Sequence, residues 1–259
     1  MIPTRELFGV PVSAITIDSA LDLIDAAIAS RRRMQIGVVN AAKLVNMRRN
    51  QELMTDVVSS DMVLADGAAV VWASRLLGRR VPERVAGIDL MMGMIERGNT
   101  RGYRVYCLGA TAEVLARATA QISSSFPGIA IVGQHHGYFT RDEEKAIADD
   151  IAQSHADILL VAMTSPRKER FLARWSRTLD FPICHGVGGS FDVLAGIVKR
   201  APITWQRLGL EWLYRVKQEP RRLWKRYLVT NAAFTIMVCS ALLREKIAGL
   251  RAPVRPTST

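Results

Sequence analysis

Residues 61–78 read Asp61-Met-Val-Leu-Ala-Asp66-Gly67-Ala-Ala-Val-Val-Trp-Ala-Ser-Arg-Leu-Leu-Gly78, and this stretch decides how the chain folds. The apolar run before Asp66 has the length of a buried strand. Asp66-Gly67 is a turn pair, and residues 68–77 have the pattern of a helix that ends at Gly78. A carboxylate between a strand and a helix lies where open α/β sheets bind their ligands. Asp66 is therefore either a ligand-facing residue or only a cap of the following helix.

The same alternation of apolar runs and helical patterns continues through the first 196 residues. Strands are expected near residues 8–14, 35–39, 61–65, 103–108, 129–132, 157–162 and 182–187. Helices are expected over residues 20–28, 41–49, 51–59, 68–77, 87–95 and 112–123, then after a cap at 137–140 up to 153, and from 165 onward. Continuously apolar strands separated by helices are typical of a parallel sheet covered on both faces. The sequence predicts an α/β, Rossmann-like fold.

Charge is distributed unevenly along the 259 residues. The chain has 35 Lys and Arg against 24 Asp and Glu, a formal net charge of +11, which indicates an anionic partner. Residues 197–227 contain nine basic and two acidic side chains, so they carry +7 of that charge. The strand pattern also stops near Gly196. We therefore expect an α/β catalytic domain over 1–196, a basic amphipathic helical appendage over 197–250 that associates with membranes, and a disordered tail over 251–259.

Several other features bound the class of protein. Cys107, Cys184 and Cys239 lie in apolar runs without metal-ligand spacing and are predicted to be core residues. The histidines lack an accompanying carboxylate or cysteine pattern, so no metal site is expected. The start of the chain does not resemble a signal peptide. Residues 228–243 form an apolar run with polar interruptions, shorter than the roughly 20 residues that span a bilayer.

A glycine-rich loop follows the last expected strand. It reads Gly186-Val-Gly-Gly-Ser-Phe-Asp192 and precedes a helical pattern. Glycines let the backbone approach a phosphate, and a helix N-terminus favours negative charge. The loop matches neither the dinucleotide-binding nor the Walker pattern. It is either a phosphate-binding loop or a tight turn without a ligand.

The basic segment after Gly196 combines cations with Trp205, Trp212 and Trp224 at helical spacing. Basic amphipathic helices with Trp and Leu lie in the bilayer interface, so an anionic membrane surface is the expected partner. A solvated helix face is the simpler interpretation. A nucleic-acid-binding protein and a catalytically silent membrane scaffold are the functional alternatives. Nucleic acid is not expected as a partner, because the chain lacks a helix-turn-helix or aromatic RNA-binding pattern.

Seven blocks in the chain together resemble the WecG/TagA/CpsF family of bacterial glycosyltransferases. In order they are Val39-Asn40-Ala-Ala-Lys43, Leu64-Ala-Asp-Gly-Ala-Ala-Val-Val71, Glu83-Arg-Val-Ala-Gly-Ile-Asp-Leu90, Gly137-Tyr-Phe139, Ser165-Pro-Arg-Lys-Glu169, Gly186-Val-Gly-Gly-Ser-Phe-Asp192, and Arg200-Ala-Pro202 with Gly209-Leu-Glu-Trp-Leu-Tyr-Arg215 and Glu219-Pro-Arg-Arg222. The resemblance extends over nearly the whole chain.

The resemblance implies an inverting transfer of a sugar from a UDP-sugar to a polyprenyl-diphosphate-linked saccharide. It places the enzyme at the cytoplasmic face of the membrane and implies no catalytic metal or other cofactor. We favour glucose as the sugar, in the biosynthesis of an exopolysaccharide or surface glycan. The alternative is transfer of N-acetylmannosamine or its uronic acid from UDP to undecaprenyl-diphosphate GlcNAc. A homo-oligomer is left open.

The resemblance also implies roles for individual residues. Asp66 corresponds to the general base, with Asn40 beside it in the catalytic set, and Arg84 to the cation that meets the diphosphate. The residues expected to bind UDP are Tyr138, Lys168, Gly188, Gly189 and Asp192. The residues expected to meet the lipid diphosphate and the membrane are Arg215, Arg222 and Lys225. The chain departs from the family pattern at Val38, where Thr is frequent, and at Lys168, where Gln is frequent.

Overall fold

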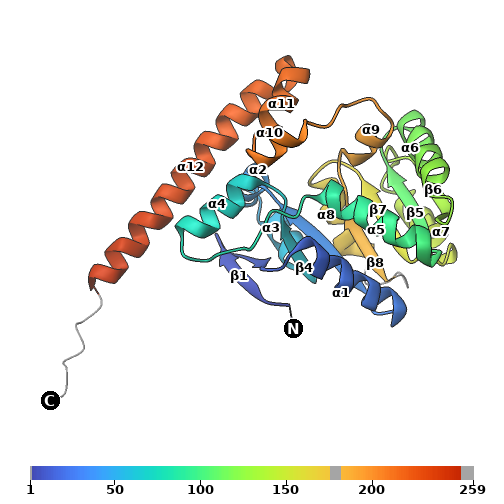
Figure 1. The fold of residues 1–259 in the computed structure, drawn as a ribbon, viewed down its shortest axis with the longest axis horizontal. Coiled ribbons are helices and arrows are strands. Elements are labelled where there is room, and N and C mark those ends of the chain that lie inside the picture. The colour runs from blue at the N-terminus through green and yellow to red at the C-terminus, as the bar shows by residue number, and fades with distance from the viewer. Residues whose placement is uncertain (1, 176–181, 252–259) are drawn as a thin grey trace.

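A six-stranded parallel sheet forms the centre of the protein (Figure 1). The computed structural model describes residues 2–175 and 182–251. The sheet has the order β4-β3-β8-β7-β5-β6. Its strands are β3 (Met34–Val39), β4 (Met62–Ala65), β5 (Arg104–Gly109), β6 (Ala130–His135), β7 (Ile158–Ala162) and β8 (Ile183–Gly186). The predicted α/β class is confirmed.

Helices cover both faces of this sheet. The helices that precede, connect and follow its strands are α1 (Ile17–Ala29), α2 (Ala41–Met47), α3 (Gln51–Val58), α4 (Ala68–Leu76), α5 (Gly87–Arg101), α6 (Ala112–Ser125), α7 (Glu144–Gln153), α8 (Arg167–Trp175) and α9 (Ser190–Leu194). Because side chains alternate across a strand, neighbouring residues of β7 enter different cores. Leu160 packs with residues of α1, α5 and α6, whereas Leu159 and Val161 pack with residues of α7 and α8. This alternation explains why the strands read as continuous apolar runs.

The N-terminus forms a hairpin and not the single strand expected over 8–14. Strand β1 (Thr4–Leu7) pairs antiparallel with β2 (Val10–Ser13). Phe8 and Gly9 connect them with φ values of 55° and 82°. Two consecutive positive φ angles are typical of the tight turns that join hairpin strands. The strand expected over 8–14 begins at Phe8, so the turn at Phe8-Gly9 was not predicted.

Two helix boundaries also differ from expectation. Helix α5 continues to Arg101, six residues beyond the predicted end, and Gly102 closes it in the left-handed conformation. Helix α7 begins only at Glu144. The backbone and hydroxyl of Thr140 instead donate to the Glu143 carboxylate, so residues 137–140 form a loop that precedes the helix without capping it.

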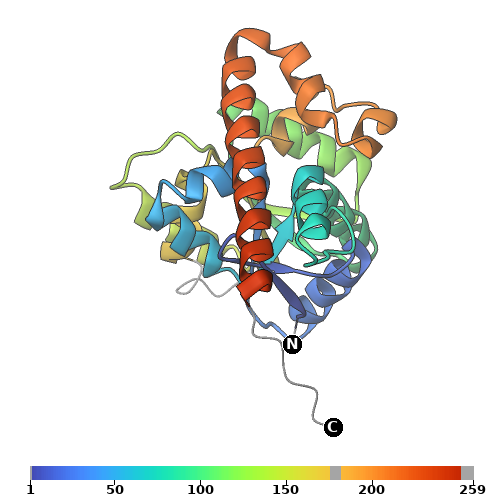
Figure 2. The same ribbon diagram turned by 90° about the vertical axis from the view of Figure 1, so that its left-hand side faces the viewer.

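After α9 the chain contains only helices within its described part. They are α10 (Ile203–Arg207), α11 (Glu211–Gln218) and α12 (Pro220–Arg251). Figure 2 shows α12 running along the length of the α/β domain. It packs against α2, and its Phe234, Met237 and Val238 belong to the same buried cluster as the hairpin. The predicted division at residues 196–200 stays a prediction, and the tail expected at 251–259 lies, beyond Arg251, outside the described residues.

Helix α12 is apolar on two opposite faces. Phe234 and Met237 are buried against the domain, whereas Leu228, Ile236 and Leu243 are exposed. By length and composition alone, residues Leu223–Ile247 could cross a membrane. The apolar stretch is therefore longer than the run recognised at residues 228–243. Because one face is packed along the domain, the helix offers only the other face to a partner.

Substitutions on the two faces should separate their contributions to stability. We expect Phe234→Ala to lower the free energy of unfolding by about 3–5 kcal/mol, because it empties a buried site in contact with Phe8. Ile236→Ala, two residues away on the exposed face, should change it by less than about 0.5 kcal/mol. Urea unfolding of both variants measures the difference. Equal effects would show that α12 is not part of the domain core in solution.

Candidate active site

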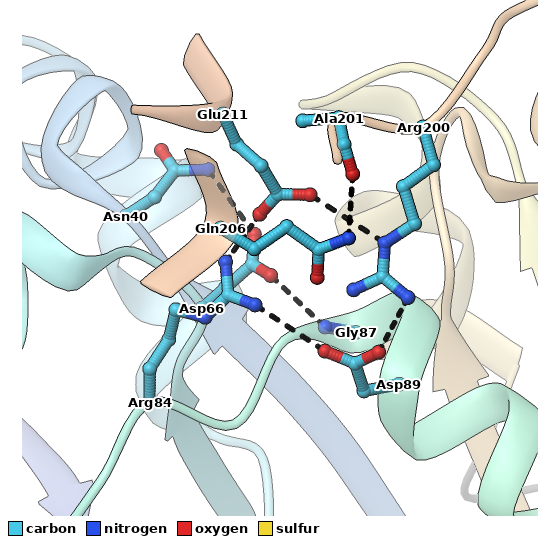
Figure 3. Close-up of polar contacts among 9 residues, drawn as sticks. All are labelled: Asn40, Asp66, Arg84, Gly87, Asp89, Arg200, Ala201, Gln206 and Glu211. Carbon is cyan, nitrogen blue, oxygen red and sulfur yellow. Dashed lines mark hydrogen bonds and ion pairs between the residues drawn. The ribbon is translucent and has the colours of Figure 1, made fainter. Parts of the chain in front are cut away.

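Asp66 lies at the carboxyl end of β4 and is held by groups from two other segments. Its backbone N–H donates to the carbonyl of Val39 on the neighbouring strand β3. Its Oδ1 accepts a hydrogen bond of 2.9 Å from the N–H of Gly87, and its Oδ2 is 3.5 Å from Nδ2 of Asn40 (Figure 3). Gly67, not Asp66, is the N-cap of α4. Asp66 therefore places its charge at the N-terminus of α5, where the helix dipole favours an anion.

Asn40 occupies the equivalent position after β3. Its side-chain oxygen accepts a bond of 3.0 Å from the N–H of Lys43 and caps α2, which leaves the amide NH₂ directed at Asp66. The two turns approach so closely that a Cβ on Gly67 would be 3.2 Å from the Cβ of Asn40. A side chain at position 67 would therefore press on Asn40, which must shift by a few tenths of an ångström to accommodate it.

A buried histidine holds the backbone at Gly87, the residue whose N–H binds Asp66. Nε2 of His185, on β8, lies 3.0 Å from the carbonyl oxygen of Gly87, so it must carry the proton and donate. Burial lowers the pKa of His185 to about 4, which keeps the ring neutral at physiological pH. From the sequence, His185 was expected to be a satisfied or exposed histidine. In the structure it is buried, its Nδ1 has no hydrogen-bond partner among the described residues, and its Nε2 supports the site through Gly87.

Arg84 lies in a cluster of four charged residues that joins the α/β domain to the C-terminal helices. Its guanidinium contacts the carboxylate of Glu211, the first residue of α11, and lies 3.4 Å from the carboxylate of Asp89 on α5. Arg200 lies 2.6 Å from Asp89 and 3.5 Å from Glu211 (Figure 3). The predicted diphosphate ligand Arg84 is thus already bound to two carboxylates. Three of these residues, Asp89, Arg200 and Glu211, were not predicted as site residues.

Lys168 is buried beneath the glycine-rich loop. Its Nζ would be 3.4 Å from a Cβ placed on Gly188, whose φ of 55° suits glycine. Glu169 also lies close, with one carboxylate oxygen 3.7 Å from this ammonium and 2.7 Å from that of Lys43. Burial, assisted by repulsion from Lys43, lowers the pKa of Lys168 to about 8. A cation at this position can meet an anion that approaches the loop, and sequence reasoning missed its partner Glu169.

The other predicted UDP-binding residues fall in two places. Gly189 begins α9, and a Cβ there would be 3.4 Å from the carboxylate of Asp192, so that side chain turns back toward the loop. Tyr138 follows β6, at the opposite edge of the sheet from β4, and is 72% exposed. The described structure therefore brings Lys168, Gly188, Gly189 and Asp192 together, whereas the Tyr138 side chain is exposed on the loop after β6.

The residues predicted for the lipid diphosphate lie on the C-terminal helices. Arg215, on α11, lines the same small cavity as Arg200 and Glu211. Lys225 is exposed on α12. Arg222 belongs to the first turns of α12, and its side chain is outside the described part of the structure. Of the two whose side chains are described, Arg215 is the one that the structure places beside the charged cluster.

The departure from the family pattern at Val38 has a simple structural form. The side chain is buried, and one of its methyl groups would be 3.7 Å from a Cβ on Gly87. It therefore packs under the peptide group that binds Asp66 and makes no hydrogen bond there.

Within residues 2–175 and 182–251, no group of three or more His, Cys, Asp or Glu side chains is arranged to hold a metal ion. Metal independence stays a prediction.

A family model described as "Glycosyl transferase WecG/TagA/CpsF family" matches residues 5–248. The chain is also 38% identical over 170 residues to the N-acetylglucosaminyldiphosphoundecaprenol N-acetyl-beta-D-mannosaminyltransferase of Bacillus spizizenii. The aligned part covers 66% of this chain and 65% of that relative, so the chain spans about two thirds of the relative's length.

The buried Lys168 should give the protein a characteristic pH dependence of stability. Its pKa is near 8 when folded and near 10.5 when unfolded, so between these values the unfolded chain binds more protons. Stability should therefore rise with pH across this window, by on the order of 3 kcal/mol relative to Lys168→Met. Urea unfolding at pH 7.5 and pH 10 measures this difference between the two proteins. Parallel pH dependences would show that Lys168 is not desolvated.

Proposed function

Because the chain belongs to the WecG/TagA/CpsF family of glycosyl transferases, we propose that it transfers a sugar from a UDP-sugar to a polyprenyl-diphosphate-linked saccharide. The observation that carries the proposal is the Asp66 carboxylate at the carboxyl edge of the sheet. It is fixed by Gly87 and Asn40, and it lies in one site with the guanidinium groups of Arg84 and Arg200 (Figure 3). A positioned base beside a cluster of cations suits the transfer of a group away from a phosphate.

In the proposed reaction Asp66 accepts the proton of an acceptor hydroxyl. The hydroxyl oxygen attacks the anomeric carbon of the donor sugar while the bond from that carbon to the diphosphate oxygen breaks. Attack opposite to the leaving group inverts the anomeric configuration. UDP leaves with the electron pair of the broken bond, and the proton is on Asp66. Asn40 and the Gly87 N–H hold the carboxylate in position through both of its oxygens.

The negative charge that develops on UDP requires compensation. Lys168 beneath Gly188, with the N–H groups of the loop, supports binding of the nucleotide phosphates at the β8–α9 turn. Arg84 supports charge stabilisation on the other side of Asp66. The proposed role of Tyr138 requires the loop after β6 to approach the nucleotide, because Tyr138 is exposed in the described structure.

The relative from Bacillus spizizenii bears on which sugar is transferred. Its name describes an N-acetyl-beta-D-mannosaminyl group and an N-acetylglucosaminyldiphosphoundecaprenol acceptor. This supports the alternative of the sequence analysis better than the glucose that we favoured there. We therefore propose UDP-N-acetylmannosamine as donor and undecaprenyl-diphosphate GlcNAc as acceptor. Supplying the protein with a panel of UDP-sugars, including UDP-glucose, and a short-chain form of this acceptor tests the assignment.

The acceptor's lipid chain implies work at a membrane surface, and α12 supports a peripheral attachment. Its exposed apolar residues Leu228, Ile236 and Leu243 lie along one face, and Ile247 continues the stripe. The opposite face is part of the domain core. A helix fixed in this way can lie in the interface with its outer face in lipid. The basic residues of the C-terminal segment would add attraction to anionic headgroups.

Removing the carboxylate charge of Asp66 should separate catalysis from binding. We expect Asp66→Asn to reduce turnover at least ~10²-fold, because the amide cannot accept the hydroxyl proton, while UDP binding changes little. The matched control is Asp61→Asn, at the amino end of the same strand, where the carboxylate accepts from the N–H of Gln35. It should leave turnover unchanged. Retained activity in folded Asp66→Asn would contradict the assignment of the base.

Charges on the outer face of α12 should release the protein from membranes. We expect Ile236→Asp to reduce flotation with vesicles that contain anionic lipid by roughly tenfold, because a carboxylate must then enter the apolar interface. Ser124→Asp, which adds the same charge on the exposed surface of α6, serves as control. Equal flotation of the two variants would show that this face does not contact lipid.

A further inference from the structure

The charged cluster at the junction with α11 has an unused capacity for binding an anion. Arg84 and Arg200 both contact Asp89 on one side and Glu211 on the other. Nη2 of Arg200 is nevertheless buried without a hydrogen-bond partner in the described part of the chain, and its Nε meets Glu211 only as an ion pair at 3.5 Å without hydrogen-bond geometry. Buried guanidinium donors of this kind are costly unless a ligand or water satisfies them. The pair of arginines therefore has more donors than its two carboxylates use.

The two carboxylates are attached to the protein in different ways. Asp89 lies in the first turn of α5, whose core residues Leu90 and Met91 are fully buried. Glu211 is the first residue of α11, a helix of eight residues with no buried side chain. The five-residue helix α10 before it has no buried side chain either. Asp89 is thus fixed to the domain, whereas Glu211 is on a segment with few packing restraints.

The turn before Glu211 packs closely against the α/β domain. Gly209 has a φ of 72° and lies against α4, where an added Cβ would be 2.7 Å from the Cβ of Ala68. Ala68 directly follows Asp66-Gly67. The segment that carries Glu211 is therefore seated next to the turn that carries the proposed base. If Glu211 moved, it would move close to Asp66, the proposed base.

We propose that Arg84 and Arg200 together bind a substrate diphosphate, and that the Glu211 carboxylate occupies this position when the substrate is absent. This inference rests on the proposed function and adds Arg200 as a ligand and Glu211 as an internal competitor. Carboxylates and phosphates are alternative partners for the same guanidinium donors. A diphosphate that binds both arginines must displace Glu211. Otherwise the diphosphate, Glu211 and Asp89 would share only two cations.

Removing the competitor should increase the affinity for diphosphates. Only molecules in which Glu211 has left the arginines are competent to bind, so the apparent affinity is reduced by their fraction. We expect Glu211→Gln to tighten binding of a diphosphate about three- to tenfold. Arg200→Gln should weaken binding about tenfold, because it removes charge-assisted hydrogen bonds. The double variant should lose the gain.

The experiment uses calorimetry on the full chain at fixed ionic strength with two probes, UDP and farnesyl diphosphate. The probe whose binding tightens identifies whether the arginines meet the donor or the lipid acceptor. Glu245→Gln is the matched control, because it removes a carboxylate of the same C-terminal segment that pairs with Arg79 instead. It should leave both affinities unchanged, which excludes a general effect of net charge.

Unchanged or weakened binding of both probes to Glu211→Gln would overturn the proposal and make Glu211 a fixed clamp. If that variant does not fold, Glu211→Asp is measured in its place, because the shorter side chain also loosens the contact and should tighten binding. These are equilibrium binding measurements and do not depend on turnover. Failure of the proposed function, detected as retained activity in Asp66→Asn, is therefore distinguishable from failure of this inference.

Discussion

The site depends on a single residue, Gly87, because both of its backbone polar groups are bound. Its N–H donates to Asp66 at the end of β4, and its carbonyl accepts from His185 within β8. Burial keeps His185 neutral, and its Nε2 proton donates to the Gly87 carbonyl. A rotation of the backbone at Gly87 would therefore leave a buried polar group unpaired. The strand that carries Asp66, the strand that leads to the glycine-rich loop and the start of α5 are thereby held at fixed positions.

Much of this arrangement could be predicted from the sequence, because it depends on local patterns. The apolar runs before Asn40 and Asp66 define adjacent parallel strands, and their register pairs Val39 with Ala65, so both polar side chains reach the same edge. The glycine at position 67 was recognised as part of a turn. Its further purpose, the close approach of Asn40, depends on packing between two segments 26 residues apart.

What the sequence did not predict consists of long-range pairings between charges. Glu211 and Arg84 are separated by 127 residues, and Glu169 and Lys43 by 126. Neither pair has a signal in composition or periodicity, since each residue alone resembles a surface charge. The role of His185 at Gly87 was not predicted for the related reason that its partner is a backbone carbonyl. Such contacts become visible only when the order of strands is known.

Helix α12 has a consequence for the stability of the protein after purification. Its inner face completes the buried cluster around the N-terminal hairpin, and its outer face exposes an apolar stripe. A partner that covers the stripe binds the folded chain and not the unfolded one, and so raises stability by mass action. On the proposed orientation the bilayer is a stabilising ligand. The melting temperature of the purified protein would then depend on the amount and kind of lipid or detergent that accompanies it.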